Sequence, residues 1–400
     1  MAVKSGRSPA GLRAATQHTA ALAATDAAVD ALFLQSGVLR VDTLEELFDV
    51  AQVLATQPLP PGRRVGIVGN AGGPGVLAAD ACEAIGLSVP ELSAATQDAL
   101  QSALGDTAVV RNPVDMAPTS GPPDFDRTVK LVLADEAIDA VLVIFSAPLS
   151  PHLEGIVGAI LSGAAARTGK PLLASVLGRH VVMGAGEHSV PSFAFPESAI
   201  RALGRVARYA EWRQRSPGQL VEFADTDRDT VRRLVDAALG DTADPVWVES
   251  SSATRLLDAY RIPRATGAAG TAGVATVVEV IEDPLFGQLV AFGPGGLVGE
   301  LLGERAFRSL PLTDLDAADL VRTAPVARLL NGMAGTAPAN LPTLEDLLLR
   351  VGQLVDDVPE ITELVLNPVI AGSETAVAAD VRVRLARRQP HPERGLRRLR

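Results

Sequence analysis

The sequence contains a single cysteine, Cys82, among its 400 residues. One cysteine cannot form an intramolecular disulfide, so nothing favours an oxidising compartment, and a reduced cytoplasm is the simplest location. The amino terminus lacks the charged start, apolar stretch and cleavage site of a signal peptide, and no apolar run is long enough to cross a membrane. We therefore expect a cytoplasmic protein without a membrane partner.

Aromatic residues are also scarce, at 4% of the chain, although 47% of its residues are hydrophobic. The hydrophobic cores must therefore consist of alanine, valine and leucine, and the length suggests two or three domains. With 36 glycines and 28 prolines available for short turns, this composition is typical of α/β proteins and disfavours an all-β fold.

Positive charge is in the minority, because 36 Lys and Arg residues face 47 Asp and Glu residues and give a formal net charge of −11. Such a surface repels nucleic acid and anionic lipid, so we expect neither as a partner. The arginine-rich segment 382–400 is a local exception that could contact an anionic partner. A solvated chain terminus is the simpler interpretation of this tail.

Apolar runs predict the first half of the fold. Thr43 and Glu46 have the spacing of a capping box before an apolar helix. Unbroken apolar strands then alternate with helices, which indicates a parallel sheet covered on both faces. We predict a flavodoxin-like doubly wound domain over 61–214. Its strands are expected at 65–69, 141–145 and 172–176, and its helices at 75–85, 124–134 and 153–167.

The pattern changes after a charged stretch, 215–250, which we expect to hold one amphipathic connecting helix. Short strands and two helices then predict an α+β unit with a mostly antiparallel sheet. The strands are expected at 277–281, 288–292, 363–366 and 376–379, and the helices at 315–322 and 343–356.

His18 lies among small residues, with Arg7 and Arg13 on its amino-terminal side. Imidazole is nucleophilic near neutral pH, small neighbours admit a bulky phosphate donor, and the arginines could hold phosphate oxygens. The pattern therefore suits a mobile phosphate carrier. A surface histidine in an alanine-rich loop is the alternative, and spacing alone favours it.

A glycine-rich turn, Asn70–Gly75, connects the strand at 65–69 to the following helix. Main-chain amides of Gly72, Gly73 and Gly75 at a helix start could bind a phosphate group. A tight strand-to-helix turn without a ligand would use the same residues, so both interpretations stay open.

Five segments, taken in order, resemble successive motifs of the NDP-forming acyl-CoA synthetase superfamily. They are 4–23, 70–75, Asn112–Asp115, Asp283–Gly287 and Phe292–Gly296. The superfamily includes ADP-forming acetate–CoA ligases, succinyl-CoA synthetase and bacterial acetyltransferases with a fused synthetase-like region. The resemblance covers nearly the whole chain.

The resemblance implies a reaction that interconverts acyl-CoA, ADP and phosphate with a carboxylic acid, CoA and ATP. In this family a histidine carries the phosphoryl group from an acyl phosphate to ADP, and His18 matches that histidine. The glycines at 72, 73 and 75 would hold the phosphate, and Gly293, Gly295 and Gly296 the nucleotide.

The last part of the chain resembles an ATP-grasp domain, in which Asn367 and Asp380 match the two magnesium ligands. Hard oxygen ligands on adjacent strands suit a magnesium ion that bridges nucleotide phosphates. The implied cofactors are therefore Mg²⁺ and ATP or ADP. An ordinary Asn-Pro turn and an aspartate at a strand end are the alternative interpretation.

The fold implied is α/β, with flavodoxin-like doubly wound parallel sheets, one partial and one complete, followed by a truncated α+β ATP-grasp domain. The expected divisions are a partial flavodoxin-like succinyl-CoA-ligase-type domain at 1–57 that carries His18, a second such domain at 61–214, a helical connector at 215–250, a truncated ATP-grasp domain at 251–385 and a basic tail at 386–400.

The sequence departs from the family pattern in three ways. It begins within the family's earlier flavodoxin-like domain, so a separate CoA-binding subunit and an oligomeric assembly are expected. The stretch between Pro263 and Val277 is too short for the lobe that clamps the nucleotide in ATP-grasp enzymes. Its only lysines are Lys4, Lys130 and Lys170, whereas ATP-grasp sites grip phosphates with lysine.

In addition, Val365 stands where the family has an acidic residue. A non-catalytic regulatory or binding subunit, or a degenerate fragment of an acetyltransferase–synthetase assembly, is therefore the alternative function.

Overall fold

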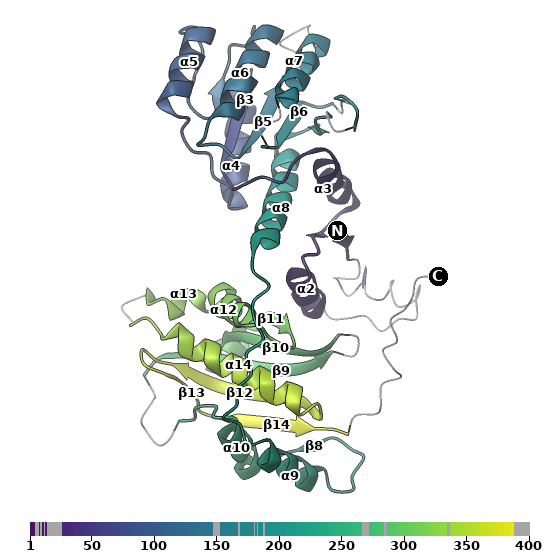
Figure 1. The fold of residues 1–400 in the computed structure, drawn as a ribbon, viewed down its shortest axis with the longest axis vertical. Helices are drawn as coiled ribbons and strands as arrows, with labels where there is room; N and C mark the ends of the chain where they lie inside the picture. Colours follow the sequence, from purple (N-terminus) through teal and green to yellow (C-terminus); the bar gives the residue numbers. More distant parts are fainter. Residues whose placement is uncertain are drawn as a thin grey trace. The chain divides into compact units, whose positions relative to one another are not determined.

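Figure 1 shows the computed structural model of the chain. It describes the whole chain apart from 5–7, 9, 12, 14–25, 147–152, 167–168, 180, 182, 187–188, 266–271, 284–285, 334–336 and 388–400, and apart from the side chains of 298, 300 and 302. The chain divides into two compact units. Unit 1 comprises Met1–Lys4 and Gly37–Arg215, and unit 2 comprises Ser5–Ser36 and Ser216–Arg400.

Unit 1 alternates strands and helices along the chain. Its elements are β1 (Ala2–Val3), β2 (Arg40–Val41), α3 (Leu44–Thr56), β3 (Val65–Gly69), α4 (Gly72–Ala84), α5 (Ala94–Leu104), β4 (Val114–Asp115), α6 (Pro122–Ala134), β5 (Ala140–Phe145), α7 (Leu153–Ala165), β6 (Leu172–Val176), β7 (Ser192–Phe193) and α8 (Pro196–Gln214).

The main sheet of unit 1 is parallel, with strand order β4-β3-β5-β6-β7. Alternate residues of its strands enter two different cores. Val141 and Val143 of β5 pack with α5, α6 and α7, whereas Leu142 and Ile144 pack with α3, α4 and α8. Both faces are thus covered by helices, which confirms the predicted flavodoxin-like parallel sheet.

The capping box predicted at the start of α3 is only half correct. Thr43 Oγ1 accepts a hydrogen bond from the main-chain N–H of Glu46, as expected of an N-cap. The Glu46 carboxylate, however, accepts from the N–H of Asp42 and pairs with Arg205 of α8. Glu46 therefore helps to fasten α3 to α8 instead of closing the box on Thr43.

Unit 2 contains one β-sheet, whose strands differ in length, and the helices that cover it. Its elements are α2 (Asp26–Gln35), α9 (Arg228–Leu239), β8 (Val246–Trp247), α10 (Ser250–Ala259), β9 (Val274–Asp283), β10 (Gly287–Pro294), α11 (Gly296–Leu302), β11 (Ala306–Ser309), α12 (Asp314–Thr323), α13 (Ala327–Leu330), α14 (Leu341–Asp357), β12 (Ile361–Ala371), β13 (Ala376–Ala378) and β14 (Val381–Leu385).

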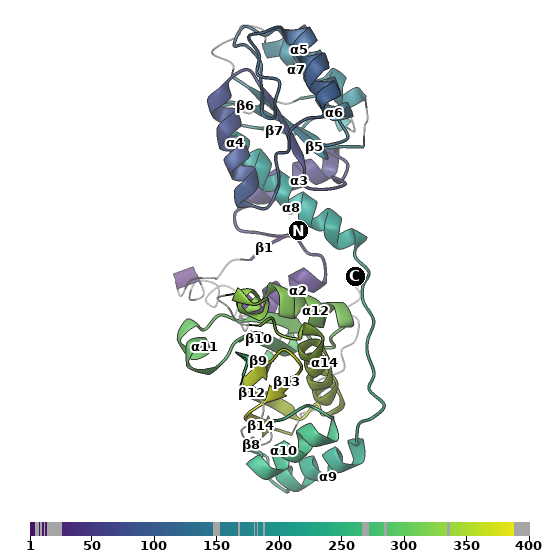
Figure 2. The same cartoon turned by 90° about the vertical axis from the view of Figure 1, so that its left-hand side faces the viewer.

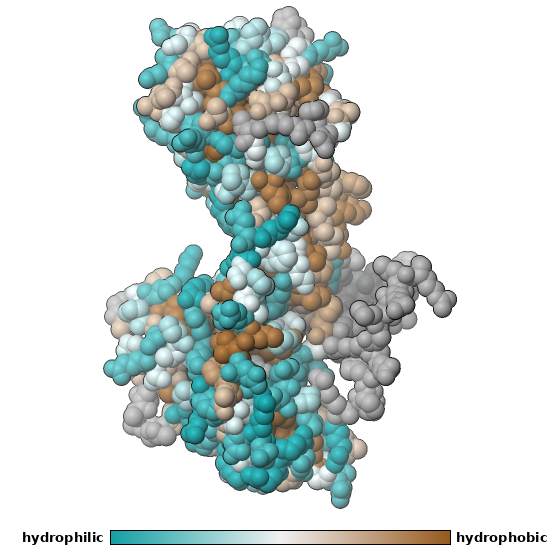
Figure 3. Space-filling model, in the orientation of Figure 1, coloured by the Kyte–Doolittle hydropathy of each residue, from teal (hydrophilic) through white to brown (hydrophobic). Residues whose placement is uncertain are grey.

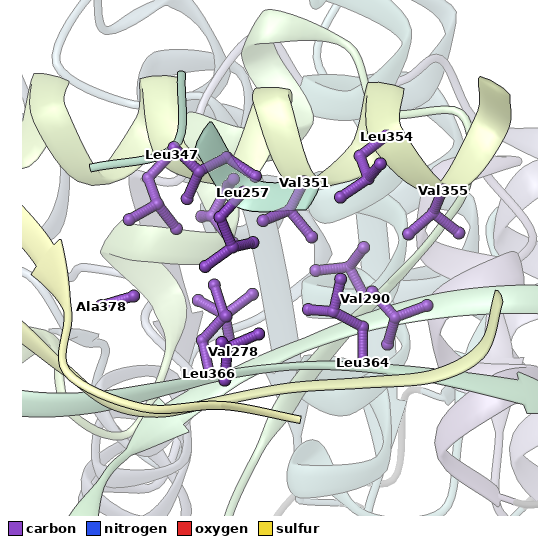
Figure 4. Packing of buried hydrophobic residues seen from close by; sticks show 14 of the residues in the cluster. Leu257, Val278, Val290, Leu347, Val351, Leu354, Val355, Leu364, Leu366 and Ala378 are labelled. Carbon is purple, nitrogen blue, oxygen red and sulfur yellow. The ribbon is translucent and has the colours of Figure 1, made fainter. Parts of the chain in front are cut away.

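The sheet of unit 2 runs in the order β11-β10-β9-β12-β14-β8, with β13 also paired to β12. Every pairing in it is antiparallel, as predicted. One face packs against α14, whose Leu347, Val351 and Leu354 lie over apolar side chains of β9, β10 and β12 (Figure 4). These helix residues recur at helical spacing, which explains why the sequence revealed α14.

Residues 215–250, expected to form a connector, contribute α9 to this same core. Val231, Leu234 and Val235 of α9 are buried in it, while the surface over α9 and α10 is mainly hydrophilic (Figure 3). The opposite face of the sheet is partly covered by α2, which lies beside β10 and β11 (Figure 2). Within the part of the chain that the structure describes, no helix has the length and apolar character needed to span a bilayer.

An ion pair at the amino-terminal end of the unit 1 sheet gives a test of this fold. Arg64 donates two side-chain hydrogen bonds, of 2.9 and 2.7 Å, to the carboxylate of Asp139, which is 4% exposed. Burial by itself would raise the pKa of Asp139, but the bonds from Arg64 outweigh burial and hold the pKa below its ordinary value.

We expect Arg64→Leu to lower the free energy of unfolding of unit 1 by about 2 kcal/mol at pH 7, because it removes the guanidinium that pairs with a buried carboxylate and leaves only the main-chain N–H of residue 64 as a hydrogen-bond donor to it. Because the pKa of Asp139 is lower in the folded protein than in the unfolded chain, the ion pair stabilises the fold above the unfolded-state pKa of about 3.9. This stabilisation is lost as the pH falls through the folded-state pKa. The deficit should therefore shrink below about pH 4. Urea unfolding across this pH range measures the deficit, followed by the fluorescence of Trp212 in a Trp247→Phe background, because Trp247 belongs to unit 2. Arg127→Leu, at an exposed position, is the control. A deficit independent of pH would contradict the assignment.

Candidate functional site

The amino-terminal turn of α4 lies at the carboxyl end of β3, in the interior of the parallel sheet. The predicted glycine turn is shorter than expected, because α4 begins at Gly72, so that Gly72, Gly73 and Gly75 belong to its first turn. The N-cap residue Ala71 has no side chain able to bond the first N–H groups. The main-chain donors of this turn and the positive end of the helix dipole are therefore suited to an anion.

The three glycines have different surroundings. A Cβ atom added to Gly72 would lie 2.7 Å from Oδ2 of Asp115, so Gly72 lets that carboxylate lie against the turn. A Cβ at Gly75 would be in ordinary contact with Pro113, and one at Gly73 would meet no atom within 4 Å. Packing thus explains Gly72, whereas Gly73 leaves open space beside the turn.

Asp115 is the acidic group of this region. It ends β4 and is aligned with Gly69 at the end of β3. Burial raises its pKa above the ordinary value for an aspartate. The carboxylate of Asp115 lies against the first turn of α4 at Gly72, so its charge bears directly on any anion bound there.

Two asparagines of the sequence motifs have structural roles. Buried Asn70 accepts a 2.8 Å bond from the N–H of Ser146, which joins the ends of β3 and β5 where the strand order reverses. Asn112 accepts from the N–H of Ile67 and donates to main-chain carbonyls, including that of Pro90. These bonds fix the strand ends that surround the glycine turn.

The second candidate region lies in unit 2, where β10 leads into α11. A Cβ at Gly295 would overlap the main-chain carbonyl of Thr276, and one at Gly293 would lie 2.5 Å from the carbonyl oxygen of Glu304. Close main-chain packing therefore accounts for both glycines without a nucleotide. Gly296 differs, since its φ is +61° and a Cβ there would face open space.

Asn367 and Asp380, which are distant in sequence, are brought together by the register of the sheet. Leu366 is paired with Val381, and Val369 with Ala378. Asn367 and Asp380 therefore lie opposite each other across neighbouring segments. The side-chain oxygen Oδ1 of Asn367 also accepts a 2.9 Å bond from the N–H of Gly296, so that this site and the predicted nucleotide loop adjoin.

The donor set of this pair fits magnesium. An amide oxygen and an exposed carboxylate are hard ligands, and Mg²⁺ is usually bound by one or two such groups together with phosphates and water. No group of three or more His, Cys, Asp or Glu residues suited to a metal occurs among the described residues. Any ion here would therefore need oxygen atoms from a nucleotide or from water.

Sequence reasoning missed Arg305 and Glu279 beside this region. Arg305 is 13% exposed, pairs with Glu279 at 3.3 Å and donates to the carbonyl of Gly299 in α11. Glu279 is aligned with Val365, the position where the family pattern has an acidic residue. Only the strand register reveals this proximity, because Glu279 lies more than eighty residues before Val365 in the sequence.

His18, the predicted phosphate carrier, lies outside the described residues. The glycine turn belongs to unit 1, and the Asn367–Asp380 pair belongs to unit 2. The sequence-predicted site residues thus form two separate clusters, each with its own geometry.

Comparison with known families covers most of the chain. Residues 1–54 match the succinyl-CoA ligase like flavodoxin domain, residues 65–217 the ligase-CoA domain, and residues 265–385 an ATP-grasp domain. The chain belongs to the NDP-forming acyl-CoA synthetase superfamily. The matched domains and their order agree with the motif order in the sequence.

The relatives of this chain include single-chain enzymes and the subunits of two-subunit enzymes. It is 26% identical to the ADP-forming 4-hydroxybutyrate–CoA ligase of Nitrosopumilus maritimus over 454 aligned residues, which cover 92% of this chain and 64% of the relative. The alignment is longer than this chain, so the relative has internal segments that this chain lacks.

Both subunits of the ADP-forming acetate–CoA ligase II of Pyrococcus furiosus also match. The alpha subunit is 38% identical, and the alignment covers 53% of this chain and 48% of the subunit. The beta subunit is 39% identical, and its alignment covers 26% of this chain and 45% of the subunit. A solved acetyl-coenzyme A synthetase of Ca. Korarchaeum cryptofilum, in complex with phosphate and ADP, is 24% identical, with 53% of this chain and 47% of that chain covered and a TM-score of 0.47.

The different surroundings of the glycines lead to a stability prediction for this chain. Gly295→Ala should destabilise unit 2 by more than about 2 kcal/mol, because the new methyl group overlaps a main-chain carbonyl that cannot move alone. Gly73→Ala should be neutral or stabilising by up to about 1 kcal/mol, since alanine favours the helix and meets no atom. Thermal unfolding of both variants measures the contrast, and equal stability would contradict it.

Proposed function

We propose that this chain carries the phosphoryl-transfer and nucleotide-binding parts of an ADP-forming acyl-CoA synthetase. The observation that carries the proposal is the juxtaposition of Asn367, Asp380 and the Gly296 N–H in an ATP-grasp sheet. The ADP-forming ligases among its relatives support the same reaction class. Because the chain spans 64% of the first of these relatives, the complete activity is part of the proposal.

The proposed reaction has three balanced steps. Phosphate attacks the acyl-CoA carbonyl, so that the acyl phosphate forms and CoA leaves as the thiol. An imidazole nitrogen of His18 then attacks phosphorus and releases the carboxylate. A β-phosphate oxygen of ADP finally takes the phosphoryl group, which yields ATP and restores His18.

The first turn of α4 is the proposed site for the phosphate in the acyl half of the reaction. The first N–H groups of a helix have no partner within the helix, so those of this turn would donate to phosphate oxygens, and the open space beside Gly73 gives room for them. Asp115 borders this site, with its carboxylate against Gly72. This role needs no lysine, because the positive potential comes from the helix end.

In the nucleotide half, Asn367 and Asp380 would hold magnesium. A bound magnesium ion would supply positive charge between the nucleotide phosphates. Asn367 also orients the Gly296 N–H, and Arg305 supplies a fixed guanidinium near α11 in a half of the chain that contains no lysine.

We further propose that a separate subunit provides the CoA-binding function and that the active form is an oligomer in the cytoplasm. Relatives named as alpha and beta subunits support assembly from separate chains.

The single cysteine, Cys82, is buried, and burial raises its pKa to about 12. We therefore expect a packed thiol that takes no part in the reaction.

The carrier role of His18 can be tested by labelling. The full chain, incubated with magnesium and ATP labelled at the γ-phosphate or with labelled acetyl phosphate, should gain an acid-labile phosphate label. His18→Ala should abolish the label, because it removes the nucleophile, whereas His152→Ala should retain it. Absence of a His18-dependent label with both donors would contradict the proposal and favour a regulatory subunit.

The magnesium site can be tested by calorimetric titration with ADP. Asp380→Asn should weaken binding about tenfold when magnesium is present, because the carboxylate charge is lost, and should have no effect in EDTA. Glu374→Gln is the matched control, because Glu374 is an exposed acidic residue in the neighbouring β12–β13 connection, whereas Asp380 lies between β13 and β14. An equal loss of affinity with and without magnesium would rule out a role as metal ligand.

A further inference from the structure

A cavity of about 370 Å³ lies at the edge of the unit 1 sheet that is opposite to the glycine turn. Its walls come from the end of α3, the end of α7 and the residues that precede β6. In a parallel sheet these segments meet at the amino-terminal ends of the strands, whereas the first turn of α4 follows the carboxyl end of β3. The cavity is therefore separate from the candidate phosphate site of this unit.

The Gln57 side chain fixes the polar part of the cavity wall. Its Oε1 accepts a 2.9 Å bond from the N–H of Leu172, the first residue of β6, and its Nε2 donates a 2.8 Å bond to the carbonyl of Ser189. Apolar side chains also line the cavity, among them Ala55, Leu133, Ala164 and Leu172. The cavity thus has the room and the partly apolar lining that suit a short acyl group.

The amino group of Lys170 lies at this cavity and is not part of an ion pair. Lys170 lines the cavity two residues before β6, and its Nζ donates a 2.6 Å bond to the main-chain carbonyl of Asp135. Among the residues that the structure describes, no carboxylate forms an ion pair with Lys170. Lys130, by contrast, pairs with Asp126 at 2.7 Å across one turn of α6. The charged form of Lys130 is therefore stabilised by a direct partner that Lys170 lacks.

The acidic groups closest to Lys170 have donors of their own. The carboxylate of Asp135 accepts hydrogen bonds from the main-chain N–H and the hydroxyl of Ser93. The carboxylate of Asp139 is paired with Arg64. Loss of the positive charge at Lys170 would therefore leave neither carboxylate without a partner.

The protonation of Lys170 is shifted toward the neutral amine. Burial lowers the pKa of this amine below the ordinary value for a lysine, and the nearby positive charge of Arg64 adds to the effect. The nearby carboxylates of Asp135, Asp139 and Glu136 oppose the lowering of the pKa without cancelling it. Because only the neutral amine is a nucleophile, Lys170 is more reactive at neutral pH than an exposed lysine.

We propose that Lys170 is a modification site of this chain, at which the amine takes a short acyl group from an acyl phosphate. The inference rests on the proposed function only for the source of the donor, since an acyl phosphate is an intermediate of that reaction. The site itself is independent of phosphoryl transfer to His18.

The modification is a simple acyl transfer. The ammonium of Lys170 first releases a proton to water, and the neutral Nζ attacks the carbonyl carbon of the acyl phosphate. The bond from this carbon to the phosphate oxygen breaks, inorganic phosphate leaves, and the nitrogen gives a second proton to water. The amide that forms keeps one N–H for the carbonyl of Asp135, and the acyl group occupies the cavity.

Peptide mass spectrometry of the full chain after incubation with acetyl phosphate tests this site. At neutral pH we expect Lys170 to be acetylated about fivefold faster than Lys130, because the amine of Lys130 is held in an ion pair. In urea the two rates should become equal, since both lysines are then exposed to solvent. Equal rates in the folded chain, or a preference for Lys170 that persists in urea, would overturn the proposal.

A variant that fills the cavity tests its role. Ala55 is exposed near the end of α3, and Ala55→Phe should slow acetylation of Lys170 about fivefold while leaving Lys130 unchanged, because the ring takes the space of the acyl group. Ala84→Phe, at an exposed position at the end of α4, is the matched control and should leave both rates unchanged. An unchanged rate at Lys170 in Ala55→Phe, or an equal loss at both lysines, contradicts the role of the cavity.

The variant His18→Ala separates this inference from the proposed function. When acetyl phosphate is supplied, acetylation of Lys170 does not require His18 and should proceed at an unchanged rate in this variant. Preferred acetylation of Lys170 in a chain whose His18 accepts no phosphate supports the modification site and contradicts the proposed function. Phosphorylation of His18 without preferred acetylation of Lys170 supports the proposed function and overturns the modification site.

Discussion

Three close contacts to the main chain at one end of the unit 2 sheet hold its candidate site together. The Cα of Gly295 lies against the carbonyl of Thr276, the hydroxyl of Thr276 donates to the carbonyl of Val369, and the N–H of Gly296 donates to the side chain of Asn367. These contacts join β10, β9 and β12. Because Asp380 lies between β13 and β14, which both pair with β12, the geometry of the oxygen ligands depends on all three contacts.

The apolar pattern of the sequence predicted the framework of both units well. Val141–Phe145 is buried on both faces, and a run without polar residues is the signature of such a strand. Helix α14 was equally visible, since its buried residues recur with helical spacing. Local patterns succeed here because burial, rather than long-range pairing, determines them.

The site was less predictable for reasons that differ between residues. Gly293 and Gly295 matched a nucleotide motif, yet main-chain packing requires them in any case, and only coordinates reveal the carbonyl that a side chain would meet. The pairing of Glu279 with Arg305 depends on strand register and on a turn, neither of which has a sequence signal. The membership of α2 in unit 2 was hidden because its contact surface consists of alanines in an alanine-rich stretch.

The order of the two units along the chain has a consequence for their independence. The chain passes between them after Lys4, after Ser36 and after Arg215, so unit 2 is built from two separated stretches of sequence. A single cut after Arg215 would leave α2 on the fragment that contains unit 1. The two fragments would then be held together by the packing of α2 on β10 and β11, that is, by a helix docked on a sheet face rather than by a covalent linker.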